Sequence, residues 1–398
     1  MAKEAYYQHP VVKEILAGLD KYTKVLHVLV GPRQTGKTTA SRQIADQWKG
    51  ETVFAAADAP LPPGPEWIHA QWDLALTKCA PRKKVLLILD EIQKVRGWSE
   101  TVKLLWDREL HEKKGLQVLL LGSSALLVQK GLTESLAGRF FQYRCGHWGY
   151  AEMKAAFGWS LEEWIFFGGY PGSAQFRKKE QDWKRFVTDS LVETVLSRDV
   201  LQLQTVAKPA LLRHLFGLAV GYPAQILSYN KMLGQLQEAG NTTTLAHYLK
   251  LLESAFIVSG LESYRSGRLA KRGSSPKLIL WNNALISAYR VLSFDQAKRD
   301  GSVWGRLVEN AVGAHLLNHL NRSFGEVLYW RDHDKEVDFV VKTEAKTWAL
   351  EVKSGRSASV GGLEAFLKKN QKAKVLMIGT GGMDLEEFFQ SNPTQLFE

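Results

Sequence analysis

Eight residues near the N-terminus have the types and the spacing of a phosphate-binding loop. The segment Gly31-Pro-Arg-Gln-Thr-Gly-Lys-Thr38 fits the pattern GxxxxGK[ST], with an apolar run, Val25–Val30, before it and a helical pattern, Thr38–Trp48, after it. Glycines let successive main-chain N–H groups curl around a phosphate at the positive end of a helix. Lys37 is then expected to reach the β- and γ-phosphates, and the Thr38 hydroxyl to bind Mg²⁺. The sequence therefore predicts a site for ATP with Mg²⁺.

A pair of acidic residues completes this prediction. Asp90 and Glu91 follow the apolar run Val85-Leu-Leu-Ile-Leu89, which is strand-sized. Asp90 is expected to hold the Mg²⁺, with Thr38, and Glu91 to polarise the attacking water. The alternative is an exposed acidic pair that ends a core strand. The residues expected to bind the nucleotide are Gly31, Pro32, Arg33, Gln34, Thr35, Gly36, Lys37, Thr38, Thr39 and Asp90.

A second group of charged residues lies near the C-terminus. Asp338 belongs to one apolar run, and Glu351 and Lys353 lie two residues apart on the next, so the last two side chains share one face. Glu309 lies on a predicted helix before these strands. The order and spacing fit a PD-(D/E)xK nuclease core, in which carboxylates hold Mg²⁺ and a lysine stabilises hydroxide or the developing phosphate charge. Two alternatives to a nuclease centre stay open. The charged residues could form the solvent-exposed face of a strand, or the nuclease-like fold could serve only to bind DNA.

Basic side chains gather in one predicted hairpin. Residues 265–273, Arg-Ser-Gly-Arg-Leu-Ala-Lys-Arg-Gly, separate the apolar runs Ile257–Leu261 and Lys277–Trp281, and a helix over Thr242–Phe256, capped by Thr242, precedes them. Helices followed by a basic two-stranded hairpin are the outline of a winged helix. Cations mixed with hydroxyls suit phosphate contact without base-specific readout, and a solvated loop is the alternative. The candidate DNA-binding residues are Lys250, Arg265, Arg268, Lys271 and Arg272.

These groups need several domains to position them, and the pattern along the chain predicts four. Apolar runs that alternate with helical patterns over residues 1–150 predict an α/β domain, a parallel sheet with helices on both faces. A helical lid is expected over 151–207 and the winged helix over 208–280. A restriction-endonuclease-like α/β domain is expected over 281–398.

The composition is that of a globular protein with a surplus of positive charge. The 398 residues carry a formal net charge of +11, which favours a polyanionic partner such as nucleic acid, or reflects solubility alone. The two cysteines, Cys79 and Cys145, form no CxxC pair and are expected to be isolated core thiols. The N-terminus lacks a secretory pattern, and no apolar run approaches the ~20 residues of a membrane span. A cytoplasmic protein without a membrane partner is expected.

Further motifs follow one another along the chain in the order found in a known group of proteins. With Gly31–Thr38, they make the chain resemble prokaryotic P-loop ATPases of the AAA/STAND superclass whose second half was long labelled a domain of unknown function. One departure is Trp281-Asn-Asn-Ala-Leu285, where the family usually has a strand that ends in Asp-x-Gly-Leu. The matching motifs are Leu89-Asp-Glu-Ile-Gln93, Leu121-Gly-Ser-Ser-Ala125, Ser135-Leu-Ala-Gly-Arg139, Gly168-Gly-Tyr-Pro171, Arg198-Asp199, Tyr329-Trp-Arg331, Glu336-Val-Asp-Phe339 and Glu351-Val-Lys-Ser-Gly355.

The resemblance implies an AAA-type P-loop core and three further roles. The strand Val118–Leu121 is expected between the P-loop strand and the strand that ends at Asp90, so Ser123 or Ser124 is a candidate γ-phosphate sensor, unless the segment is only a turn. Arg139 is a candidate arginine finger across a subunit boundary, and a solvated surface arginine is the alternative. Gly168–Pro171, by its residues a rigid turn, is implied to pack against the nucleotide base.

Three functions stay open on these features. The first is an oligomeric ATPase, with a hexameric ring as one option, that remodels or translocates DNA, such as branched DNA, held by the C-terminal domains. The second is a nucleotide-dependent switch that recognises a partner. The third is an ATP-gated DNA nuclease. DNA-stimulated ATP hydrolysis separates the first function from the second.

Overall fold

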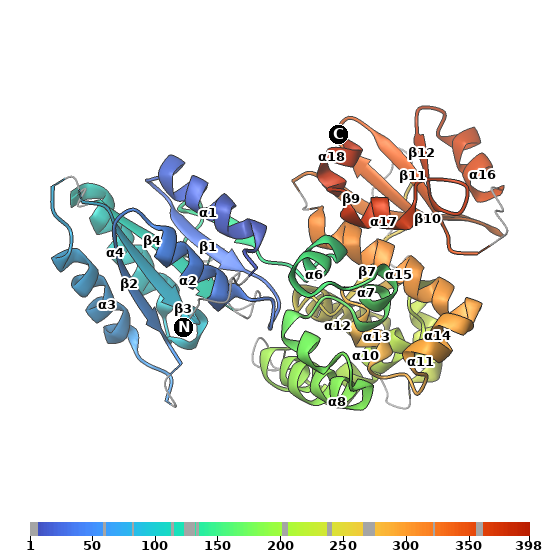
Figure 1. Ribbon diagram of the computed structural model, residues 1–398, viewed down its shortest axis with the longest axis horizontal. Helices are drawn as coiled ribbons and strands as arrows, with labels where there is room; N and C mark the ends of the chain where they lie inside the picture. Colours follow the sequence, from blue (N-terminus) through green and yellow to red (C-terminus); the bar gives the residue numbers. More distant parts are fainter. Residues whose placement is uncertain are drawn as a thin grey trace. The chain divides into compact units, whose positions relative to one another are not determined.

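The computed structural model divides the chain into two compact units, Met1–Gly146 and His147–Glu398, which are described one at a time. No helix within the described part of the chain is both long and apolar enough to cross a membrane. The described residues are 7–58, 61–81, 83–112, 115–122, 132, 135–200 without the side chains of 198 and 199, 206–236, 241–265, 275–320, 323–355 and 361–398 (Figure 1).

The N-terminal unit is built on a five-stranded parallel sheet. Its strands lie in the order β2-β3-β4-β1-β5, and each neighbouring pair is parallel. This confirms the parallel α/β prediction, including the place of β4 between the P-loop strand β1 and the strand β3 that ends at Asp90. The strands are β1 (Leu26–Val30), β2 (Glu51–Ala56), β3 (Val85–Asp90), β4 (Leu116–Gly122) and β5 (Phe140–Arg144).

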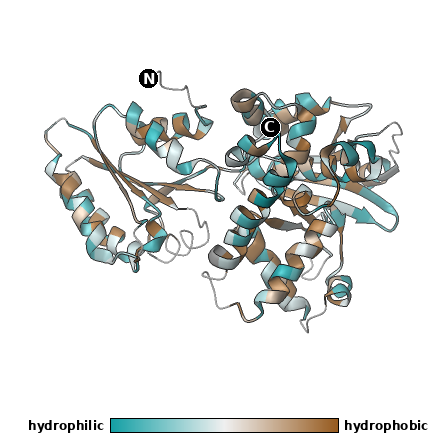
Figure 2. Ribbon diagram, turned by 60° about the horizontal axis from the view of Figure 1, so that its bottom comes forward, coloured by the Kyte–Doolittle hydropathy of each residue, from teal (hydrophilic) through white to brown (hydrophobic). Residues whose placement is uncertain are grey.

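Helices cover both faces of this sheet. Val28 packs with side chains of α3 and α4 on one face, whereas its neighbour Leu29 packs with side chains of α1 and α2 on the other. Because successive side chains of a strand point to opposite faces, a strand buried on both sides must be apolar throughout. Figure 2 shows these strands as mostly hydrophobic ribbons. The helices are α1 (Pro10–Lys21), α2 (Lys37–Gln47), α3 (Pro65–Thr77) and α4 (Trp98–Glu112).

The C-terminal unit begins with short helices. A break at Gly168–Tyr170 follows α7, and a 3₁₀ turn, Pro171–Phe176, follows the break. The helix α8 continues into two π-helical segments, Phe186–Val192 and Val195–Val200. The helical pattern expected after residue 150 is therefore present, with its interruption at Gly-Gly-Tyr-Pro. The α-helices of this part are α6 (Tyr150–Phe157), α7 (Leu161–Phe167) and α8 (Glu180–Arg185).

Three helices and a small antiparallel sheet come next. The sheet has the order β6-β8-β7, and both of its pairs are antiparallel. The N-cap expected at Thr242 is wrong by one residue, because Oδ1 of Asn241 accepts the N–H of Thr244 at 2.8 Å and Thr242 is already helical. The elements are α10 (Pro209–Gly221), β6 (Gln225–Ile226), α11 (Tyr229–Gln235), α12 (Thr242–Ser254), β7 (Val258–Leu261) and β8 (Lys277–Leu280).

The rest of the unit contains a long helix and a mixed sheet. The sheet has the order β12-β11-β10-β9, in which β12 is parallel to β11 and the other pairs are antiparallel. The helix that carries Glu309 and the strands that carry Asp338 and Glu351 agree with those expected from the sequence. They are α13 (Ala284–Ser287), α14 (Phe294–Arg299), α15 (Gly301–His319), β9 (Gly325–Asp332), β10 (Lys335–Thr343), β11 (Thr347–Lys353), α16 (Gly361–Lys369), β12 (Lys374–Gly379), α17 (Leu385–Gln390) and α18 (Pro393–Phe397).

A buried asparagine occupies the position where the resemblance led us to expect an acidic residue. Asn282, two residues after the end of β8, accepts the N–H of Gly169 on Oδ1 at 3.0 Å. Its Nδ2 lies 3.1 Å from Nδ1 of His147. A carboxylate could make the first contact but has no proton to donate in the second. The amide therefore fixes the Gly-Gly-Tyr-Pro break within the C-terminal unit.

The fully buried Asn310 of α15 holds the end of β8. Its Oδ1 accepts the N–H of Leu280, and its Nδ2 donates to the Leu280 carbonyl, each at 2.9 Å. Asn310→Ala removes the partner of both the buried N–H and the buried carbonyl of Leu280, so we expect the free energy of unfolding to fall by about 2–4 kcal/mol. Urea unfolding followed by circular dichroism measures the loss. Asn230→Ala, at an exposed position in α11, should change stability by less than ~0.5 kcal/mol; equal losses would contradict this role for Asn310.

Candidate functional site

The loop between β1 and α2 is shaped by close packing against the chain that follows β5. A Cβ on Gly31 would lie 1.9 Å from the carbonyl oxygen of Cys145, so the backbone can approach this closely only with glycine. Gly36, the residue before α2, has a φ of 87°, in the left-handed region that favours glycine. Both glycines of the GxxxxGK pattern are thus required by the shape of the loop.

Cys145, which follows β5, forms hydrogen bonds with the loop. The Thr35 hydroxyl, fully buried, lies 3.0 Å from the Pro32 carbonyl and 3.2 Å from the Cys145 carbonyl, and it can donate to either. The thiol of Cys145 donates to the Thr35 carbonyl at 3.3 Å. Cys145 is a core thiol, as the sequence predicted, but it is not isolated from the site.

Lys37 turns back over the loop. Its Nζ donates to the carbonyls of Gly31 at 3.1 Å and Pro32 at 2.6 Å, and the residue is only 7% exposed. Burial lowers the pKa of Lys37, while nearby negative groups, including Glu91 and Asp90, oppose that shift. An ammonium held by neutral carbonyls gains energy when charged phosphate oxygens replace them. The side chain is therefore placed to exchange loop carbonyls for phosphate.

Thr38 and Asp90 meet across the sheet edge. The Thr38 hydroxyl donates to Oδ2 of Asp90 at 2.8 Å, and Oδ1 of the same carboxylate accepts the N–H of Glu91 at 2.9 Å. Asp90 is 3% exposed, and burial raises the pKa of its carboxyl group. A hydroxyl and a carboxylate side by side are the oxygen ligands that Mg²⁺ prefers. These two residues fit a magnesium ion.

Glu91 sits in an unusual backbone conformation directly after β3. Its φ is 54°, in the left-handed region, which non-glycine residues rarely adopt and which is common at functional sites. Its Oε2 accepts a hydrogen bond from Nε2 of Gln93 at 2.5 Å. Gln93 lies in the motif Leu89–Gln93, and the sequence predicts no role for its side chain. The contact makes it a candidate positioning residue for Glu91.

The other expected ATPase residues stand apart from these contacts. Ser123 and Ser124 lie outside the described residues, directly after β4. Arg139 pairs with Asp107 of α4, with Nε 2.7 Å from Oδ1 and Nη2 3.1 Å from Oδ2. Arg33 is half-buried, whereas Gln34 and Thr39 are exposed. A role of Arg139 as a finger in another subunit requires Asp107 to release it.

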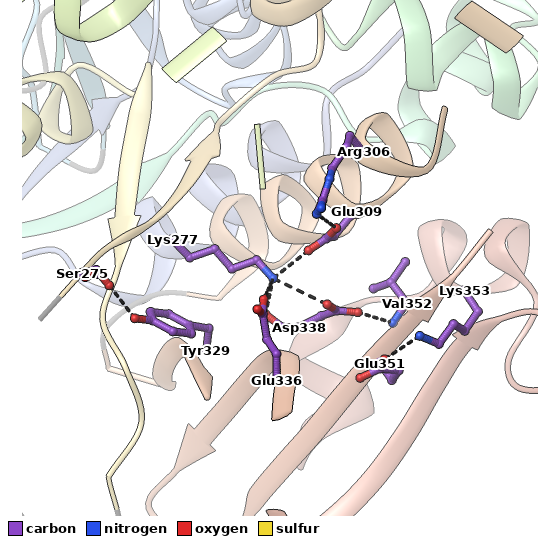
Figure 3. Close-up of polar contacts among 10 residues, drawn as sticks. All are labelled: Ser275, Lys277, Arg306, Glu309, Tyr329, Glu336, Asp338, Glu351, Val352 and Lys353. Carbon is purple, nitrogen blue, oxygen red and sulfur yellow. Dashed lines mark hydrogen bonds and ion pairs between the residues drawn. The ribbon is translucent and has the colours of Figure 1, made fainter. Parts of the chain in front are cut away.

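The C-terminal carboxylates gather around a lysine that the sequence did not predict (Figure 3). Nζ of Lys277, on β8, lies 2.6 Å from Glu309 Oε1, 3.2 Å from Glu336 Oε1 and 3.6 Å from Asp338 Oδ1. The Lys277 side chain is 0% exposed. The structure therefore brings the expected Glu309 and Asp338 together and adds Glu336 and a cation to them.

Glu351 and Lys353 form their own ion pair beside this cluster. Nζ of Lys353 lies 2.6 Å from Oε1 of Glu351, as expected for two side chains on one face of β11. Burial, and then the charge of Asp338, raise the pKa of Glu351 to about 7. Oδ2 of Asp338 accepts the N–H of Val352 at 2.8 Å. The lysine expected to assist cleavage is engaged with a carboxylate.

The candidate DNA-binding residues are only partly described. Lys250, on α12, and Arg265, after β7, are exposed. Arg268, Lys271 and Arg272 lie outside the described residues, and so does the tip of the expected hairpin. The side chains of Arg198 and Asp199, part of the family resemblance, are also outside the described residues.

Comparison with protein families agrees with the fold and the loop geometry. A family model described as an AAA domain matches residues 23–154. The N-terminal unit is thus a P-loop ATPase domain of the AAA type. Two models of domains of unknown function match the remainder, DUF8612 over residues 158–296 and DUF4143 over residues 304–394.

Individual relatives extend this likeness over most of the chain. The uncharacterized protein Rv2008c of Mycobacterium tuberculosis is 26% identical over 364 residues, which are 89% of this chain and 76% of that protein. An uncharacterized protein of Haemophilus influenzae is 21% identical over 343 residues, 81% of this chain and 80% of that protein. The Walker-type ATPase PABY2304 of Pyrococcus abyssi matches 73% of this chain and 97% of its own at 13% identity and a TM-score of 0.50, which is a likeness of fold.

Proposed function

We propose that this protein is a Mg²⁺-dependent ATPase that acts on DNA. The observation that carries the ATPase part is the hydrogen bond between Thr38 and Asp90, 2.8 Å long, beside a loop that holds the Lys37 ammonium. This contact supports a metal site with two oxygen ligands next to a cation for phosphate. An AAA-type domain over this segment supports the proposal.

The residues of the loop and of β3 divide the chemistry between them. Lys37 binds the β- and γ-phosphates in place of the Gly31 and Pro32 carbonyls. Thr38 and Asp90 hold Mg²⁺, which when bound neutralises charge on the phosphates. Glu91 accepts the proton of the attacking water, and Gln93 orients that carboxylate until the water arrives.

The DNA part of the proposal is supported by charge and by the order of elements. The succession α10, β6, α11, α12, β7, β8, with an antiparallel sheet in the order β6-β8-β7, supports a winged helix here. Lys250 and Arg265 are exposed on it, and the whole chain carries a net charge of +11. Such a surface suits phosphate contacts that are largely independent of sequence.

We propose the following domain scheme for the full chain. Residues 1–150 form the AAA-type core and 151–207 a helical lid. Residues 208–280 form the winged helix, and 281–398 form a PD-(D/E)xK-like domain. The order α15, β9, β10, β11, α16, β12 and the mixed sheet support the last assignment. A homo-oligomer, in which Arg139 reaches the neighbouring subunit's nucleotide, completes the proposal.

ATP hydrolysis measured with DNA of different shapes tests the proposed function. We expect single-stranded, duplex, forked or four-way DNA to raise the hydrolysis rate severalfold at low salt, with cleavage scored in the same tubes. If no DNA changes the rate and none binds at low salt, the DNA-acting part of the proposal fails and a nucleotide-dependent switch is favoured.

The salt dependence of DNA binding tests the exposed basic residues. The slope of log K against log salt is negative, and each lost phosphate contact makes it less steep by about 0.9. Lys250→Ala/Arg265→Ala should therefore reduce the steepness by about 2 and weaken binding. The matched control Lys49→Ala/Lys372→Ala removes the same charge from exposed positions elsewhere and should leave the slope within about 0.5 of wild type. Equal effects of the two pairs would mean that binding follows overall charge.

The switch is the second candidate, and two contacts favour it. Gln93 holds Glu91, and Asp107 holds Arg139, so both groups expected to speed hydrolysis are engaged within their own unit. A partner that breaks these contacts would start turnover. The DNA experiment above distinguishes a DNA partner from a protein one.

A further inference from the structure

The cluster around Lys277 joins three separate elements. Lys277 belongs to β8, Glu309 to α15, and Glu336 and Asp338 to β10 (Figure 3). One carboxylate oxygen of each acidic residue lies within 4.8 Å of the others, close enough for one cation to serve all three. Nζ of Lys277 also donates to the main-chain oxygen of Asp338 at 3.1 Å and lies 5.0 Å from the centre of the Phe339 ring.

The ammonium of Lys277 already supplies the positive charge that a metal ion would bring to these carboxylates. Burial lowers the pKa of Lys277, but the three carboxylates raise it by more, so the net shift is upward and the ammonium stays charged. A divalent cation held by the same three carboxylates would lie beside the ammonium, whose Nζ is 2.6, 3.2 and 3.6 Å from Glu309, Glu336 and Asp338. Two cations so close together would repel one another strongly. The residues therefore do not fit a bound metal while Lys277 is in place.

We infer that Lys277 is the resident cation of this cluster and closes a latent divalent-metal site in the PD-(D/E)xK-like domain. In this conformation the Glu309, Glu336 and Asp338 carboxylates are then occupied by the ammonium instead of by a catalytic metal, and the cluster ties β8 to α15 and β10. Lys353 engages Oε1 of Glu351, the other carboxylate expected to bind metal. The inference stands on these contacts and does not depend on ATP or DNA binding.

Manganese binding to nucleotide-free protein tests the inference. Electron paramagnetic resonance of Mn²⁺ counts the bound ions, and thermal unfolding with and without Mn²⁺ reports their effect on stability. Lys277→Met removes the ammonium and keeps the length of the side chain. We expect this variant to gain one Mn²⁺ site per chain that the wild type lacks, together with an unfolding temperature that Mn²⁺ raises.

Two further variants locate the gained site. Lys277→Met/Asp338→Asn should lose the gained ion, because one carboxylate of the cluster is gone. Lys342→Met removes an exposed lysine from the same strand as Asp338 and should behave as wild type. A gain that survives Asp338→Asn, or that Lys342→Met also shows, would overturn the inference.

The wild-type protein decides the question even if Lys277→Met does not fold. Mn²⁺ binding by the wild type that Asp338→Asn abolishes would overturn the inference, whereas its absence supports it. Lys277→Gln removes the positive charge, keeps a polar side chain beside all three carboxylates, and then replaces Lys277→Met in the titration. Failure of this folded variant to bind Mn²⁺ more tightly than wild type would also overturn the inference. Neither readout involves ATP hydrolysis, so failure of the proposed ATPase would be recognised separately.

Discussion

Lys37→Ala should abolish detectable Mg·ATP binding and lower ATP hydrolysis by at least about 100-fold. The ammonium of Lys37 is buried in the loop, 2.6 Å from the Pro32 carbonyl, and phosphate is the anion that the loop amides and this cation can share. Alanine removes the charge while leaving the glycine-dependent shape of the loop intact. Isothermal titration calorimetry measures the binding, and phosphate release measures the hydrolysis.

The exposed Lys49, near the end of α2, provides the control. Lys49→Ala removes the same charge from the same part of the unit and should keep both binding and hydrolysis within about twofold of wild type. Unchanged nucleotide binding in Lys37→Ala would show that the loop between β1 and α2 is not the triphosphate site.

Glu91→Gln should keep Mg·ATP bound and lower its hydrolysis by about 10²–10⁴-fold. The amide has the shape of the carboxylate but cannot accept the proton of water, whereas Thr38 and Asp90, the proposed metal ligands, are unchanged. A single-turnover experiment with radiolabelled ATP separates the two effects, because ATP stays bound while phosphate release slows.

The control is Glu66→Gln at an exposed position in the first turn of α3. It makes the same chemical change and should hydrolyse ATP at the wild-type rate. If Glu91→Gln also hydrolysed ATP at that rate, another group would be the base, and the left-handed backbone of Glu91 would need a different explanation.

The sequence predicted the parts of the site that depend on neighbours along the chain. The loop Gly31–Thr38 is a local motif, and Asp90 ends a strand whose apolar run is unbroken. The parallel sheet then brings both to one edge, because carboxyl ends of parallel strands meet there. The cap of α12 shows the limit of local patterns: Asn241 and Thr242 are both good capping residues, and only the backbone decides between them.

The parts that the sequence missed depend on contacts between distant residues. The thiol of Cys145 meets Thr35 across 110 residues, and the ammonium of Lys277 meets Glu336 across 59. Lys277 is the first residue of the run Lys-Leu-Ile-Leu-Trp, and a lysine at the start of an apolar strand is typical of a solvent-exposed position. Its burial follows from the packing of β8 against α15 and β10, and no spacing rule along the chain carries that information.

The two carbonyl contacts of Lys37 have a consequence for product release at the proposed nucleotide site. A phosphate entering that site would first displace the Gly31 and Pro32 carbonyls from the ammonium. When the phosphate leaves, the same carbonyls can again accept hydrogen bonds from the ammonium, so release does not leave a buried charge without partners. Product release is therefore less costly, which suits repeated turnover.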